Sequence, residues 1–118
     1  MDSEAYNYYN KAEERLKATG CLFMCQSKNA RFEEAIDLYE RAAQLYIRNK
    51  NWAEAGQCYE KIADCQKKSG EDPLRSYEQA SYYFCQVPGS ISNNNKNNKE
   101  INKYLLIFLL TKFIHINY

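Results

Sequence analysis

Apolar side chains recur along the middle of this chain with the three- and four-residue spacing of amphipathic helices. The first stripe is Phe32, Ala35, Tyr39, Ala42 and Tyr46, and the second is Trp52, Ala55, Tyr59, Ile62 and Ala63. Charged residues fill the intervening positions, so each stripe predicts a helix with one face buried. The alanines leave room for a neighbouring helix to approach closely, and the rings fill the remaining space. We therefore expect Trp52 and Tyr59 to pack against the helix that carries Phe32 and Tyr39.

The two stripes are copies of one motif. Residues 32–43 recur, with the aromatic, Ala and Tyr-Glu-basic positions in register, at residues 52–63, twenty positions later. A third copy begins at Tyr77, and a fainter one at Tyr9. Two helices thus occupy about forty residues, close to the period of tetratricopeptide-like and HEAT-like arrays. The sequence predicts an all-α fold of antiparallel helical hairpins in a tetratricopeptide-like repeat array, an α-solenoid.

Capping signals give the expected helix ends. Asn51 and Glu54 have the spacing of a capping box, and Gly70 is a stop signal. Asp72 is an expected N-cap because Pro73 suits the first helical position. The predicted helices are 4–18, 30–48, 52–68 and 73–86.

The sequence offers no equipment for catalysis and no set of metal ligands. The single histidine, His115, lies near the C-terminus, and no nucleophile, paired acid or Gly-rich phosphate loop is apparent. Of the five cysteines only Cys21 and Cys25 lie close together, without the two tight pairs of a structural zinc site. We expect no enzyme, no cofactor and no metal, and buried, reduced thiols in a cytoplasmic protein.

Charge and composition favour a protein-binding scaffold. The formal net charge is +1, so no overall field attracts nucleic acid, and no nucleic-acid partner is expected. Eleven tyrosines suit surfaces that are half core and half solvated. The N-terminus lacks the layout of a secretory signal. An alternative function is a generic tetratricopeptide-like scaffold that captures peptide tails, although no clear Lys/Asn clamp is visible.

Three segments of the repeat have a more specific sequence: FEEA at 32–35, the turn KNWAEAG at 50–56 and IADC at 62–65. Together they resemble the N-terminal part of the soluble NSF attachment proteins, the SNAP family, and the Lys-Asn-Trp turn favours the alpha-like over the gamma-like branch. The resemblance covers about residues 5–86. It implies an adaptor in vesicle-mediated transport that clasps SNARE complexes, lies peripherally on membranes in the cytoplasm, and in full-length relatives recruits the NSF-type ATPase that disassembles those complexes.

Two sets of candidate site residues follow. Leu22, Phe23 and Met24 form an apolar loop beside basic residues, which suits shallow insertion into a bilayer interface. The resemblance implies membrane attachment there, although the loop could equally fold back over the helix pair. The basic residues that could meet an acidic SNARE bundle are Arg41, Arg48, Lys50, Lys61, Lys67 and Lys68. Interleaved with Glu at helical spacing, they could also be ordinary solvated positions.

The sequence changes character after Gln86. Residues 93–99 are a polar low-complexity run, and residues 104–110 are almost purely apolar but too short to cross a bilayer. We expect residues 1–86 to form the helical-repeat domain and residues 87–118 to lie outside the fold. From residue 93 onward nearly every residue is Asn, Lys, Ile, Tyr, Phe or Leu, amino acids that have A/T-rich codons. Such a composition suggests translated non-coding sequence, which would make the chain a truncated relative that cannot recruit the ATPase.

Overall fold

The structure, a computed structural model, describes residues 3–17 and 28–88, and in these segments every regular element is a helix. The four helices are α1 (Ser3–Lys17), α2 (Lys28–Arg48), α3 (Trp52–Ser69) and α4 (Leu74–Gln86). Each boundary lies within two residues of its predicted position, so the all-α prediction is confirmed. Most of the predicted tail, residues 89–118, lies outside the described residues, and the prediction about it stays a prediction.

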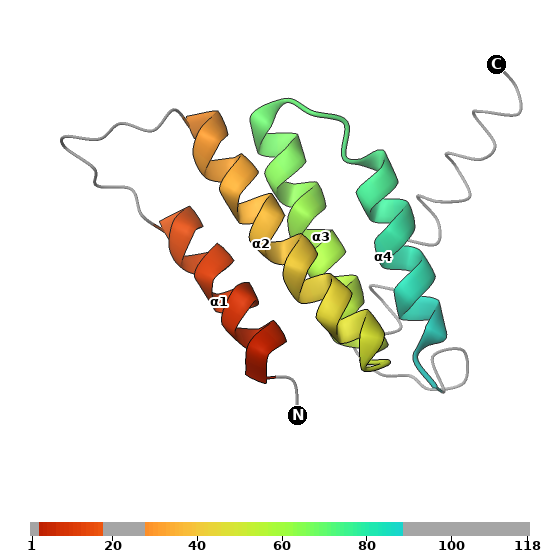
Figure 1. The fold of residues 1–118 in the computed structure, drawn as a ribbon. Coiled ribbons are helices and arrows are strands. Elements are labelled where there is room, and N and C mark those ends of the chain that lie inside the picture. The colour runs from red at the N-terminus through yellow and green to blue at the C-terminus, as the bar shows by residue number, and fades with distance from the viewer. Residues whose placement is uncertain (1–2, 18–27, 89–118) are drawn as a thin grey trace, which may run out of the picture.

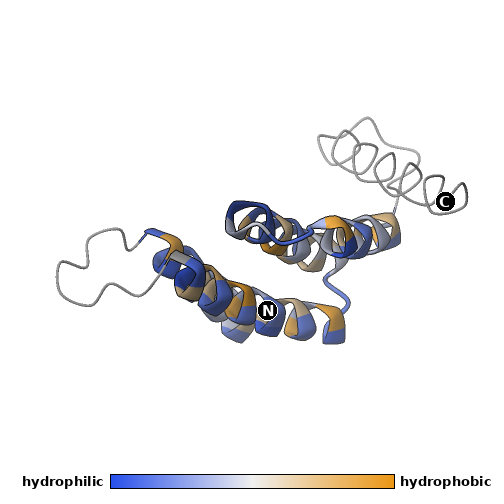
Figure 2. Cartoon of the chain, turned by 90° about the horizontal axis from the view of Figure 1, so that it is seen from above, coloured by the Kyte–Doolittle hydropathy of each residue, from blue (hydrophilic) through white to orange (hydrophobic). Residues whose placement is uncertain are grey.

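The helices lie side by side in chain order and alternate in direction (Figure 1). The contacts between helices join mainly consecutive ones, α1 with α2, α2 with α3 and α3 with α4. Seen from above, each helix carries hydrophobic and hydrophilic positions on different sides (Figure 2), as the stripes predict. In residues 3–17 and 28–88 no helix combines the length and the apolar character that crossing a membrane would require.

The core consists largely of the alanines and rings of the predicted stripes. Ala35, Ala42 and Ala55 are fully buried, and Tyr39 is the largest side chain with no exposed surface. Helix α1 contributes Ala5 and Ala12, which are 1% and 0% exposed. Because alanine allows close approach, the helix axes come near enough for the intervening rings to contact both neighbours.

The interface between α3 and α4 depends on a glycine. A Cβ atom at Gly56 would lie 2.8 Å from ring carbons of Phe84, so the ring occupies the space that a side chain would need. Beside it, Tyr83 stacks on both Trp52 and Tyr59, with ring centroids 6.1 and 5.5 Å apart. Tyr59 also packs against the core cluster that contains Phe32 and Tyr39, as predicted. Trp52 is only half-buried and stacks on Tyr83 of α4, so its predicted packing against α2 stays a prediction.

Helices α2 and α3 end in the same hydrogen-bonded motif. After α3, Gly70 has a φ of 85°, and the N–H groups of Gly70 and Glu71 donate to the carbonyls of Lys67 and Gln66. After α2, Lys50 takes the same place with a φ of 61°, and the N–H groups of residues 50 and 51 donate to the carbonyls of residues 47 and 46. Both are Schellman motifs. The predicted stop at Gly70 is confirmed, and a lysine occupies the equivalent left-handed position after α2.

The two predicted N-caps differ. The Asn51 side chain makes no capping hydrogen bond, so the predicted capping box with Glu54 is wrong; the backbone N–H of Asn51 closes the end of α2 instead, by donating to the Tyr46 carbonyl. The N-cap position of α4 is Pro73, one residue beyond the predicted Asp72, but Asp72 Oδ1 accepts a hydrogen bond of 3.1 Å from the Leu74 N–H. That side chain satisfies one of the free amide groups of the first turn.

Candidate interaction surfaces

The predicted membrane residues Leu22, Phe23 and Met24 lie outside the described residues. The helix ends on either side of them are described: α1 ends at Lys17 and α2 begins at Lys28. Because the helices alternate in direction, these two ends lie at the same end of the array as the connection from α3 to α4 (Figure 1). The last turn of α3 therefore shares its end of the molecule with the start and finish of the segment 18–27.

Four of the six predicted partner-binding residues fall into two groups at opposite ends of α3. Arg48 and Lys50 are exposed next to the turn between α2 and α3, and Lys67 and Lys68 are exposed in the last turn of α3. The 18 residues of α3, at about 1.5 Å per residue, separate the groups by roughly 25 Å. The six residues therefore do not form one continuous basic patch.

The other two predicted residues already contact α1. The guanidinium of Arg41 lies 5.9 Å from the ring centroid of Tyr8, within the range of a cation–π interaction. The Nζ atom of Lys61 lies 3.5 Å from Oε1 of Glu13. Both side chains thus help to hold α1 in place.

A groove runs between α1 and α3, with α2 as its floor, and two cavities open along it. The first, about 620 Å³, lies towards the start of α1 and is lined by Ser3, Tyr6, Tyr9, Tyr46, Asn51, Glu54 and Gln57. The second, about 420 Å³, lies towards the segment 18–27 and is lined by Glu13, Leu16, Arg31, Phe32, Lys61, Asp64, Cys65 and Lys68. The lining positions on α3 are spaced by three and four residues, which places them on one face of the helix. The first cavity is lined by three tyrosines and by polar side chains, of which one is charged, whereas most of the side chains that line the second are charged.

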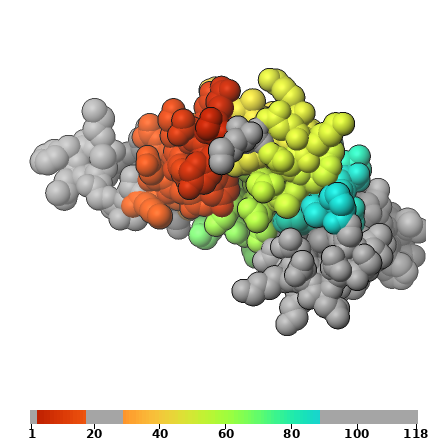
Figure 3. Space-filling view, turned by 90° about the horizontal axis from the view of Figure 1, so that it is seen from below, coloured from red at the N-terminus to blue at the C-terminus, as the bar shows by residue number. Residues whose placement is uncertain are grey.

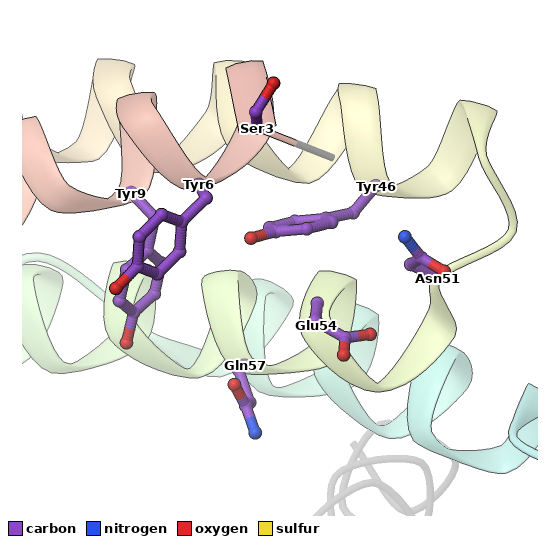
Figure 4. Close-up of a pocket in the computed structure, with 7 residues that line it drawn as sticks. All are labelled: Ser3, Tyr6, Tyr9, Tyr46, Asn51, Glu54 and Gln57. Carbon is purple, nitrogen blue, oxygen red and sulfur yellow. The ribbon is translucent and has the colours of Figure 1, made fainter. Parts of the chain in front are cut away.

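We call the first cavity the tyrosine groove, because Tyr6, Tyr9 and Tyr46 line it. These three rings differ in how firmly they are held. Tyr46 is 7% exposed and packs in the core, and in Figure 4 its ring lies between the helices, with the hydroxyl directed towards Tyr6 and Tyr9. Tyr9 packs edge to face on Tyr39 with centroids 5.4 Å apart; burial, and secondarily the Glu13 carboxylate, raise its pKa above the ordinary value. Tyr6 is 59% exposed. The tyrosine groove therefore has two rings that are held by packing, Tyr9 and Tyr46, and one exposed ring, Tyr6.

Sequence reasoning did not identify the tyrosine groove as a site. The signal was available in the spacing of Tyr6 and Tyr9, which lie three residues apart and so project from one side of α1. The contribution of Tyr46 could not be read in the same way, because it depends on how α1 and α3 flank α2.

The opposite flank of α2 is strongly acidic. A cavity of about 520 Å³ there is lined by Ala30, Glu33, Glu34, Ile36, Asp37, Glu40 and Glu71. Partial burial, and then the neighbouring Asp37, raise the pKa of Glu40. The two long sides of α2 therefore present different chemistry, with rings on one and carboxylates on the other.

The described thiols are mostly inert. Cys58 and Cys65 are buried, and Cys85 is exposed. Burial, with a smaller contribution from Glu54, raises the pKa of Cys58 to about 12, and burial raises that of Cys65 to about 11. Within residues 3–17 and 28–88 no group of His, Cys, Asp or Glu side chains could hold a metal ion.

Comparisons with known proteins agree with this architecture. The family model described as soluble NSF attachment protein, SNAP, matches residues 3–74, which contain α1, α2 and α3. The chain is 39% identical over 85 residues to the vesicular-fusion protein SEC17 of Komagataella phaffii. That match covers 70% of this chain and 29% of the relative, so the chain spans less than a third of the relative's length. No solved structure matches.

Proposed function

Because the chain belongs to the soluble NSF attachment protein family, we propose that it serves as an adaptor in vesicle fusion that binds SNARE complexes and rests on the cytoplasmic surface of a membrane. The observation that carries this proposal is the family match over residues 3–74, which spans three packed helices and the apolar segment between the first two. An adaptor of this kind acts by binding surfaces alone. The predicted absence of catalytic groups suits it.

We further propose that the four helices are the beginning of a tetratricopeptide-like array, an α-solenoid. Two features support this: consecutive helices alternate in direction (Figure 1), and each packs mainly on its neighbours in the chain. A sequence motif with a twenty-residue period gives each added helix the same buried stripe.

For the membrane contact, the charges at one end of the array support the proposal. Lys17, Lys67 and Lys68 are exposed at the end where the segment with Leu22 and Phe23 begins and finishes. A lysine near an anionic leaflet contributes about 1 kcal/mol, so these three could add to the gain from apolar insertion. The same lysines would orient the array with this end towards the lipid.

Flotation with anionic liposomes tests the membrane contact. A version of the chain that ends at Pro88 avoids lipid binding by residues 104–110. Leu22→Ser with Phe23→Ser, and separately Lys67→Gln with Lys68→Gln, should each reduce flotation while circular dichroism shows unchanged helix content. Equal flotation of all three proteins would rule out this end as the membrane contact.

The SNARE contact is tested by neutralising the two basic groups separately. Arg48→Gln with Lys50→Asn removes one group, and Lys67→Gln with Lys68→Gln removes the other; asparagine at position 50 tolerates the left-handed backbone. Pull-down with a purified SNARE bundle should weaken for at least one pair. If both double variants bound the SNARE bundle as well as the unchanged chain does, these residues would be removed from the proposal. Recruitment of the NSF-type ATPase, expected only of full-length relatives, stays a prediction.

A further inference from the structure

The tyrosine groove has the chemistry of a cation-binding surface. Two of its rings, Tyr9 and Tyr46, are fixed by packing against the core, and the third, Tyr6, is mostly exposed at the edge. Among the seven lining residues the only charged side chain is that of Glu54, which is exposed. Rings carry a negative face, so the rings and the carboxylate both favour a positively charged group.

One tyrosine on α1, Tyr8, already binds cations within this chain. The ring of Tyr8 has Lys11 Nζ at 5.6 Å and the Arg41 guanidinium at 5.9 Å from its centroid. These contacts occupy Tyr8, which lies outside the groove. Tyr6, two residues earlier in α1, has a ring of the same kind next to the cavity.

We propose that the tyrosine groove binds a peptide segment that presents an arginine side chain to Tyr6, Tyr9 and Tyr46. Arginine fits better than lysine because its planar guanidinium stacks on rings and also pairs in a fork with a carboxylate, here that of Glu54. The amide groups of Asn51 and Gln57 and the hydroxyl of Ser3 line the same cavity. These polar groups suit the backbone of an extended peptide.

This partner differs from the one in the proposed function and does not depend on it. A SNARE bundle would meet the array through its own acidic side chains and basic residues of the array, whereas the charged residue that lines the tyrosine groove is Glu54. The Glu54 carboxylate attracts a basic partner into the groove, whereas the exposed Arg48 and Lys50, which could meet an acidic partner, lie outside its lining. The tyrosine groove would also lie away from a membrane bound at the other end of the array (Figure 3 shows the molecule from the end at which α1 begins).

The test is a titration of the full chain, labelled with ¹³C-tyrosine, with the amidated heptapeptide Gly-Ser-Gly-Arg-Gly-Ser-Gly, followed by NMR. Substitution with phenylalanine, one site at a time, assigns the signals of Tyr6, Tyr9 and Tyr46. These three should shift on titration, and the same peptide with citrulline, the neutral analogue of arginine, should cause no shift. Tyr6→Ala and Glu54→Gln should each weaken binding about two- to fivefold, and Tyr6→Phe, which keeps the ring, should not.

The acidic flank of α2 provides the matched control. Asp37→Asn with Glu40→Gln removes two carboxylates from that flank and leaves the groove intact, so binding should be unchanged. Binding that falls as much in this control as in Glu54→Gln would show charge attraction without a site, and would overturn the proposal. Equal binding of the citrulline peptide, or unchanged affinity in Tyr6→Ala, would overturn it as well.

Discussion

The carboxylate of Glu13 on α1 lies 3.5 Å from the ammonium of Lys61 on α3, so an ion pair joins two helices that are not consecutive in the chain. Helix α2 lies between them as the floor of the groove. The same carboxylate contributes to the raised pKa values of Tyr9 and Tyr39, after burial. Glu13 thus influences residues on all three helices that form the groove.

A double-mutant cycle with Glu13→Gln and Lys61→Met should give a coupling free energy of roughly 0.5 to 1 kcal/mol by urea denaturation, because the side chains are 27% and 42% exposed and solvent screens the pair. The pair of Arg15 and Glu34, 3.4 Å apart but 59% and 39% exposed, should couple more weakly. A coupling near zero for Glu13 and Lys61 would mean that the pair does not hold α1 to α3.

Gly56→Ala should lower the free energy of unfolding by about 1 to 3 kcal/mol, because the new methyl group overlaps the Phe84 ring. Alanine is about 1 kcal/mol the better helix former, so the substitution would stabilise an open position. Adding Phe84→Leu, which removes the obstructing ring, should recover part of the loss caused by the alanine. A more stable Gly56→Ala protein would show that α4 moves aside freely.

Lys50→Gly should raise the free energy of unfolding by about 1 kcal/mol, because a left-handed residue with a side chain is strained by roughly that amount. Gly70→Ala is the reverse experiment at the equivalent position after α3. It should be destabilising although nothing lies within 4 Å of the new Cβ. Thermal melts of both variants give the comparison, and a loss of stability in Lys50→Gly would contradict the shared motif.

The free energy of unfolding should change little near neutral pH and should decrease above pH 9. Burial raises the pKa of Cys58 from 9.0 to about 12 and that of Cys65 from 9.0 to about 11, and burial, with a lesser effect of Tyr83, raises that of Tyr59 from 10.0 to about 12. Above pH 9 the unfolded chain loses these protons while the folded chain keeps them, so stability is fully present below pH 9 and declines as pH rises towards 11 or 12.

Within that window each of these groups contributes a slope of about 1.4 kcal/mol per pH unit. Urea denaturation between pH 7 and pH 10.5 measures the slope. Cys58→Ala removes one group and should flatten it, whereas substitution of the exposed Cys85 by alanine should leave it unchanged. A slope that Cys58→Ala does not alter would show that this thiol ionises equally in both states.

The helices were predictable because local signals agreed with one another. The apolar stripes, Gly70 as a stop and the hydrogen bond from Leu74 to Asp72 each depend on residues a few positions apart, and the structure places them as expected except for Trp52, which is only half-buried. The prediction of a capping box at Asn51 is wrong because of the backbone conformation of the residue before it. The left-handed Lys50 folds the backbone so that the Asn51 N–H serves α2, and a lysine gives little warning of that conformation.

The candidate surfaces were less predictable, because they depend on which neighbour a helix turns towards. A helix inside an array has a partner on each side, so the stripe that contains Trp52 could not show that this ring faces Tyr83 on α4. Side-chain spacing within a helix was visible in the sequence; contacts between helices were not.

Because most contacts join consecutive helices, the chain closes only short loops as it folds. Low contact order of this kind is associated with folding in microseconds to milliseconds. Each helix can add to the one already formed, in the order in which a ribosome delivers them. In such arrays stability grows interface by interface, so the α1–α2 pair can assemble before the residues of α4 have been synthesised.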